Sequence, residues 1–142
     1  MTREDINRDL SAYKRGVEKL AKLTAEREQY MTMGTNMSPV YSHTPKPLNN
    51  SGKVEPAALA LAALDREIDG VKDKLPKQKE RVLELLGLLS EGVALRMMMY
   101  HYVECREMSE IEALMNYSYS RLRQLRSDAI GKITEKIITH YQ

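Results

Sequence analysis

The apolar residues of the first thirty positions follow one face of a helix. They recur at alternating steps of four and three residues, at Ile6, Leu10, Tyr13, Val17 and Leu20. This spacing is typical of the seam between two paired helices. Thr2 can cap the first turn, where Glu4 and Asp5 suit the positive end of the helix dipole. The pattern predicts an N-terminal helix that ends near Tyr30, within a first segment of residues 1–30.

The next segment, residues 31–54, has no hydrophobic period. It holds three of the five prolines and two of the seven glycines. Such a composition predicts a long flexible loop. Two interpretations of this loop stay open: it joins two helices, or it is an arm that binds a partner.

A second apolar stripe runs through residues 55–91. Pro56 suits a first helical turn, and Gln78 fills the one polar position of the stripe. Its apolar members are Leu61, Leu64, Ile68, Val71, Leu75, Val82, Leu85 and Leu89. The stripe stays in phase across Pro76, which favours a kinked helix over two separate helices. The two stripes predict a long antiparallel helical hairpin, coiled-coil-like in its packing, although a parallel pairing of two chains would bury them equally well.

Residues 92–142 predict a set of shorter helices. The first has a broad apolar face made by Val93, Leu95, Met98, Met99, Tyr102 and Val103. Its three consecutive methionines, Met97 to Met99, point about 100° apart around a helix, so their sulfurs cannot converge on one metal ion. Core packing is therefore the favoured interpretation. The apolar end of the chain, Ile130 to Ile138, is expected to pack on this helix or to pair two chains.

A helix-turn-helix is predicted within the same segment. A short helix over 109–115, capped by Ser109, would bury Ile111, Leu114 and Met115. Asn116 tolerates the left-handed conformation that a sharp turn needs, and Tyr117 would point inward. The next helix is expected to begin at a Ser118 cap and to bury Leu122, Leu125 and Ala129. This spacing suits two helices crossing around a small core, although Glu112 stands where a small residue is common.

The outward face of the second helix carries the candidate chemistry. From residue 118 to 142 there are five basic and two acidic residues, whereas residues 104–115 hold four glutamates and one arginine. Arginine can read guanine and glutamine can read adenine through paired hydrogen bonds. We therefore assign base edges to Tyr119, Ser120, Arg123, Gln124 and Ser127. We assign DNA phosphates, which fix the register without reading sequence, to Ser118, Arg121 and Arg126.

Composition adds few further constraints. The net charge is only +2, so any contact with double-stranded DNA must come from a local patch. One cysteine, Cys105, excludes an internal disulfide, and the short apolar runs argue against a membrane span. The three histidines, His43, His101 and His140, are scattered, and no phosphate-cradling loop or metal-ligand spacing is present. We expect a cytoplasmic protein that is not an enzyme and that needs no cofactor or metal.

The C-terminal third resembles a known family. The stretch "YHYVECREMSEIEALMNYSYSRLRQLRSDAIGKI" is similar to the ArpU/RinA-type phage regulators of late transcription, whose C-terminal part resembles region 4 of bacterial sigma factors. The matching positions are Tyr102, Val103, Ile111, Met115, Tyr117, Ser118, Arg126, Ala129 and Ile133. His101 and Cys105 stand where that family often has Arg and Gly. The resemblance implies a sequence-specific regulator of phage or prophage genes in a bacterial host cell.

Two other functions remain open at this point. Small terminase subunits also join a helix-turn-helix to helical hairpins, but they often carry it at the N-terminus. A helical protein-protein adaptor would use its tyrosine-rich helices on a protein partner. As a regulator, the chain could contact host RNA polymerase and could form a homodimer through the helical hairpin.

Overall fold

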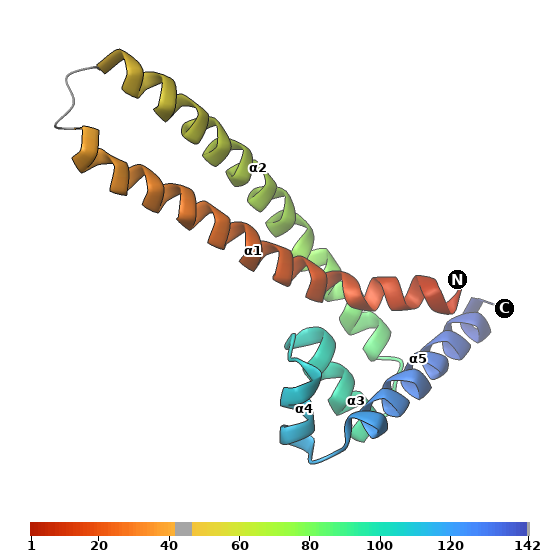
Figure 1. Cartoon of the computed structure of the whole chain (residues 1–142). Coiled ribbons are helices and arrows are strands. Elements are labelled where there is room, and N and C mark those ends of the chain that lie inside the picture. Colours follow the sequence, from red (N-terminus) through yellow and green to blue (C-terminus); the bar gives the residue numbers. More distant parts are fainter. Residues whose placement is uncertain (42–46, 142) are drawn as a thin grey trace. The chain divides into compact units, whose positions relative to one another are not determined.

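The computed structural model describes the backbone of residues 1–41 and 47–141 and the side chains of residues 1–32 and 56–139. The fold is all-α, as the sequence predicts (Figure 1). Its elements in chain order are α1 (Arg3–Tyr41), α2 (Pro47–Leu86), α3 (Val93–Met98), the π-helical turn η1 (Met99–Val103), α4 (Met108–Met115) and α5 (Tyr119–Tyr141).

The chain divides into two compact units. The first unit joins Met1–Val17 to Lys74–Gln142, and the second is Glu18–Asp73. The division crosses both long helices, so α1 and α2 each contribute to both units. The helix-turn-helix therefore shares its unit with the beginning of α1 and the end of α2, which the sequence pattern did not predict.

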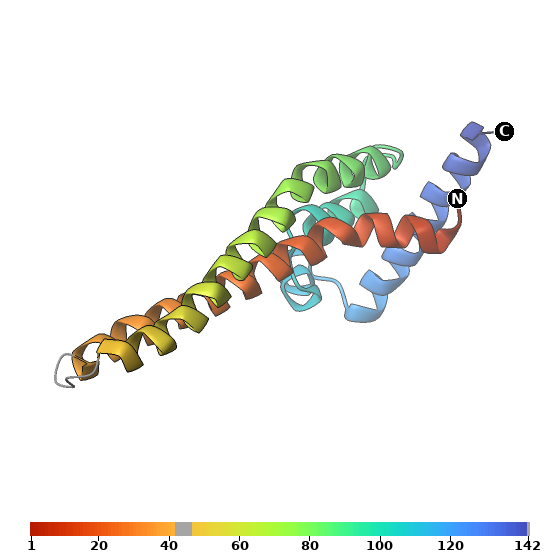
Figure 2. The ribbon, with the colours of Figure 1, turned by 90° about the horizontal axis from the view of Figure 1, so that it is seen from above.

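In the second unit, the segments of α1 and α2 run antiparallel, side by side (Figures 1 and 2). Leu23 packs there with Leu64 and Ile68, and all three side chains are buried. The Arg27 Nε donates to Asp65 Oδ1 at 2.6 Å and links the two helices beside this apolar seam. The predicted hairpin within one chain is thereby confirmed.

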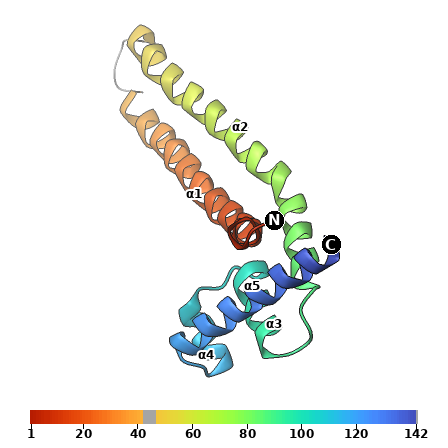
Figure 3. The same cartoon turned by 90° about the vertical axis from the view of Figure 1, so that its right-hand side faces the viewer.

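The first unit holds the larger core. Helix α5 contacts both α3 and α4 (Figure 3). The buried side chains come from every helix of the unit and are Ile6, Leu10, Val82, Leu85, Leu86, Met97, Met98, Tyr102, Ile111, Leu122, Ala129, Ile130, Ile133 and Ile137. Met97 and Met98 are fully buried, which confirms core packing for these methionines. Helix α5 packs on α3, and Ile130, Ile133 and Ile137 share one core with Met97 and Met98, which is one of the two arrangements that the sequence left open.

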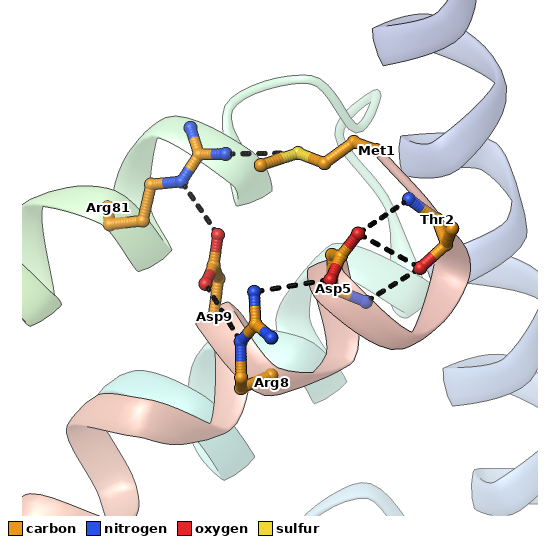
Figure 4. Close-up of polar contacts among 6 residues, drawn as sticks. All are labelled: Met1, Thr2, Asp5, Arg8, Asp9 and Arg81. Carbon is orange, nitrogen blue, oxygen red and sulfur yellow. Dashed lines mark hydrogen bonds and ion pairs between the residues drawn. The ribbon is translucent and has the colours of Figure 1, made fainter.

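The beginning of α1 is fixed by hydrogen bonds within its first turn (Figure 4). The Asp5 N–H donates to Thr2 Oγ1 at 3.2 Å, and the Thr2 N–H donates to Asp5 Oδ2 at 3.0 Å. The predicted Thr2 cap is therefore confirmed, and the hydrogen bonds from Thr2 lower the pKa of Asp5. Farther along, Arg81 Nε lies 3.3 Å from Asp9 Oδ2 and joins α2 to α1.

Several helix boundaries differ from the prediction. The loop expected over 31–54 is wrong at both ends, because α1 continues to Tyr41 and α2 already begins at Pro47. Extending a helix costs less than nucleating one, so weak helix formers are tolerated beyond Tyr30. The remaining part of that loop, 42–46, lies outside the described residues.

The bounds of α2 also differ from the prediction, at both ends. Pro56 is an interior residue of α2, and the first-turn position that suits proline is taken by Pro47. The helix continues through Pro76, so the alternative of two separate helices is wrong. Helix α2 ends at Leu86 rather than at residue 91. After it, the N–H groups of Leu88 and Leu89 donate to the carbonyls of Leu85 and Leu86, three residues back, as in the last turn of many helices.

Two helical glycines give a first prediction. A Cβ at Gly16 would lie 2.7 Å from Leu75 Cδ2 and 2.9 Å from Gln78 Oε1, whereas one at Gly70 would meet nothing within 4 Å. We expect Gly70→Ala to raise the free energy of unfolding by about 1 kcal/mol, the usual gain of alanine over glycine in a helix. Gly16→Ala should gain less, because its methyl must displace two side-chain ends. Chemical denaturation of both variants checks this, and equal gains would contradict it.

Candidate nucleic-acid interface

The turn between α4 and α5 has the predicted conformation. Asn116 ends α4 in the left-handed region, at φ 58° and ψ 43°, and its N–H donates to the Glu112 carbonyl at 2.8 Å. Asparagine tolerates this region better than most residues with a side chain. The assignment of the chain reversal to Asn116 is confirmed.

Helix α5 begins with a serine cap. The Arg121 N–H donates to Ser118 Oγ at 3.2 Å, and the Leu122 N–H donates to the Ser118 carbonyl at 3.0 Å. Leu122 and Ala129 are buried on the inner face of the helix, and Leu125 is half-buried. The expected cap and inner face of α5 are therefore confirmed.

Helix α4 differs from the expectation in its cap. Glu107, rather than Ser109, is the N-cap residue, and its N–H donates to Glu110 Oε1 at 3.3 Å. The helix accordingly begins at Met108, so Ser109 is its second residue and is exposed. Glu110, three residues after Glu107, satisfies the N–H of the cap, although Glu112 stands at the same spacing from Ser109.

Three apolar side chains expected in the core are exposed. Their exposed fractions are 43% for Val93, 52% for Leu114 and 37% for Tyr117. Ile111 and Met115, one helical turn apart, make the inward face of the short helix α4, and Leu114 lies at its edge. Tyr117 follows the left-handed Asn116, so the chain has already turned away from the core there.

The first two turns of α5 present polar side chains to solvent. Tyr119, Ser120, Arg121, Arg123 and Gln124 are all exposed, as the sequence predicts. The Arg123 guanidinium lies 5.7 Å from the centre of the Tyr119 ring, one helical turn earlier. A guanidinium over an aromatic face at this distance is weakly attracted to it, so Tyr119 restrains Arg123 on the outer face.

Two further predicted site residues are engaged within the protein. Ser127 was expected at a base edge, but its hydroxyl accepts a hydrogen bond from Arg3 Nη2 at 2.8 Å and its carbonyl accepts another at 2.9 Å. Arg3 uses the Ser127 oxygen only as an acceptor, so the assignment of Ser127 to a base edge stays a prediction. Arg126 is half-buried beside Tyr102. Burial raises the pKa of Tyr102, and the positive charge of Arg126 opposes that rise.

Arg3 is the site residue that the sequence did not reveal. It lies 124 positions before Ser127, and its position among the first residues of an amphipathic helix carried no distinguishing signal. Only the packing of the beginning of α1 beside α5 brings the two together.

His101 lies on η1 beside these residues. Its Nδ1–H donates to the Arg106 carbonyl at 3.2 Å. Burial lowers the pKa of His101 below 6.5, the positive charges of Lys14 and Arg126 lower it further, and the hydrogen bond to Arg106 opposes them. His101 therefore favours its neutral form in the folded protein.

A pH dependence of stability follows from this pKa. Below about pH 6.5 the unfolded chain binds a proton at His101 more readily than the folded chain does, so the free energy of unfolding should fall as the pH falls. His101→Asn keeps an amide that can donate to Arg106 but cannot titrate. Thermal melting at pH 7.5 and 5.5 should show a smaller loss for this variant. An equal loss in both proteins would assign the pH dependence to other groups.

In comparisons with known proteins, no protein-family model, no curated protein and no solved structure matches the chain. Over the described residues, no three His, Cys, Asp or Glu side chains are grouped so that they could hold a metal ion. The same part of the chain contains no helix with the length and apolar character of a membrane span.

Proposed function

We propose that the chain is a sequence-specific DNA-binding protein that places α5 in the major groove. The observation that carries the proposal is the division of α5 into two faces. Leu122 is fully buried, while Tyr119, Ser120, Arg123 and Gln124 around it are exposed. Readout of base edges requires a helix whose apolar face packs on the protein and whose opposite, polar face is exposed to the groove.

Each exposed residue has a role in this proposal. Arg123 reads guanine and Gln124 reads adenine through paired hydrogen bonds, and Tyr119 and Ser120 contact neighbouring base edges. Arg121 and the start of α5 at Ser118 contact phosphates, because helix N-termini favour anions. Ser127 can still donate its hydroxyl proton to a base edge, because the hydrogen bond from Arg3 uses only the oxygen as an acceptor.

We further propose that the chain regulates transcription of phage or prophage genes inside a bacterial host cell. This rests on the resemblance to the ArpU/RinA-type regulators. Cys105 lends it support, since this residue has a φ of 58° and stands where that family often has glycine. Glycine adopts this conformation without steric cost, so the backbone of this chain suits the residue that the family prefers.

Selection of bound sequences from random duplex DNA tests the proposal. We expect the full chain to enrich a short motif, and the double variant Arg123→Ala/Gln124→Ala to lose that enrichment. Lys132→Ala, an exposed residue two turns farther along α5, is the matched control and should keep the motif. If the unaltered chain enriched no motif and bound duplex DNA with no preference, sequence-specific regulation would be wrong.

The mass of the protein in solution separates the regulator from a packaging subunit. A monomer or a dimer fits the regulator, and a dimer would also fit pairing through the helical hairpin. A large ring would favour a small terminase-like subunit instead.

A further inference from the structure

A groove of about 450 Å³ lies within the first unit, beside the outward face of α5. The first three turns of α1, the π-helical turn η1 and the first half of α5 surround it. Arg3 and Asn7 line it from α1, Tyr102 lines it from η1, and Arg123 and Arg126 line it from α5. The beginning of α1 lies next to α5 in Figures 1 and 2, which is how Arg3 reaches this groove.

The groove is positively charged. Three guanidinium groups line it, from Arg3, Arg123 and Arg126, and Glu4 is the one carboxylate among the described residues that line it. None of the three arginines forms an ion pair with another residue of the described part of the chain. Elsewhere in that part, Arg81 and Arg106 each lie within 4 Å of carboxylates. An excess of unpaired guanidinium charge around one hollow attracts anions.

One of these arginines is held in position by neutral acceptors. Arg3 donates to both the carbonyl and the hydroxyl of Ser127, and Arg126 lies close enough to Tyr102 for its positive charge to act on that hydroxyl. A Cβ at position 131 would lie 3.3 Å from Arg3 Nη1, so Gly131 leaves room for the Arg3 guanidinium beside α5. Neutral partners fix the orientation of a guanidinium without neutralising its charge. The guanidinium of Arg3 is therefore already oriented in the groove before an anion binds.

We propose that this groove binds a phosphate group, with Arg3 and Arg126 as its principal donors. Guanidinium groups match phosphate oxygens through two parallel hydrogen bonds. The phosphate has two possible sources: a phosphodiester of DNA bound to α5, or a free phosphorylated small molecule. The first source rests on the proposed function, and the second does not.

A titration of the full chain with inorganic phosphate tests the groove without any variant. The Nε–H signals of the arginines are followed by NMR, against sodium chloride at the same ionic strength. We expect saturable shifts at Arg3 and Arg126 and none at Arg8. The Arg8 side chain is 67% exposed on the same helix and pairs with Asp5 and Asp9. Shifts of equal size at all three arginines, or none at Arg3 and Arg126, would overturn the proposal.

Variants at Arg3 provide a second measurement. Arg3→Gln should weaken phosphate binding by at least about five-fold. Arg3→Lys should weaken it by less, because lysine keeps the positive charge but lacks the two parallel donors of the guanidinium. Arg8→Gln is the matched control and should leave phosphate binding unchanged. Thermal melting of each variant shows whether losing the hydrogen bonds to Ser127 unfolds the first unit. If Arg3→Gln is unfolded, the phosphate affinity of Arg3→Lys is compared with that of Arg8→Gln instead. Equal phosphate affinity in Arg3→Gln, Arg3→Lys and Arg8→Gln would overturn the role of Arg3.

DNA binding by the same variants distinguishes the two sources. If the phosphate belongs to DNA, Arg3→Gln should weaken binding to all duplexes and reduce the slope of log K against log salt by about 0.9, one phosphate contact. If only phosphate affinity changes, a free phosphorylated molecule is the ligand. If the unaltered chain binds no DNA but inorganic phosphate still saturates the groove, the proposed function is wrong and the proposal that the groove binds phosphate stands.

Discussion

Leu122→Ala is expected to lower the free energy of unfolding by about 2–5 kcal/mol, the usual cost of removing a fully buried leucine side chain. Leu122 has no exposed surface and belongs to the core that α5 shares with Ile111 of α4. The truncation leaves a cavity where the two helices of the helix-turn-helix meet. Chemical denaturation followed by circular dichroism measures the loss.

Leu114→Ala is the matched control for this prediction. Leu114 belongs to α4, and half of its side chain, 52%, is exposed. Because truncation of this exposed side chain removes little buried apolar surface, we expect the free energy of unfolding to change by about 0.5 kcal/mol or less. If the two variants lost equal stability, Leu122 would not be the residue that fixes α5 to α4.

The parts of the fold that the sequence predicted depend on near neighbours. The stripes of α1 and α2, the left-handed Asn116 and the Ser118 cap each follow from residues within four positions. Helical periodicity, turn preference and capping act over that range. The exposed face of α5 was predictable for the same reason, since burying Leu122 and Ala129 leaves Arg123 and Gln124 outside.

The parts that the sequence did not predict depend on competition or on distance. Ser109 and Glu107 could both cap α4, because each has a glutamate three residues later, and the structure uses the pair of Glu107 and Glu110. The proline-rich composition of 31–54 hid the end of α1, up to Tyr41, and the beginning of α2, from Pro47, because propagation of a helix can outweigh unfavourable residues. Chain topology alone brings Arg3 to Ser127, so no local pattern could reveal that side of the groove.

Arg123→Ala is expected to weaken binding to the selected DNA site by about 1–3 kcal/mol, roughly 5- to 150-fold, and to relax specificity at one base pair. Arg123 is exposed on the second turn of α5 and is restrained only by the Tyr119 ring. A guanidinium so placed can donate two hydrogen bonds to guanine, and alanine can donate none. Competition binding with every single-base variant of the site measures the change.

Arg121→Ala is the control that separates base readout from phosphate contact. Arg121 has the same side chain two positions away and is also exposed. In the proposed complex it meets a phosphate, so its loss should weaken cognate and random DNA alike and reduce the salt slope by about 0.9. The two arginines should thus fail in different ways, one in specificity and the other in overall affinity. If Arg123→Ala also weakened all sequences equally, Arg123 would be a phosphate contact and the orientation of α5 in the groove would have to be reversed.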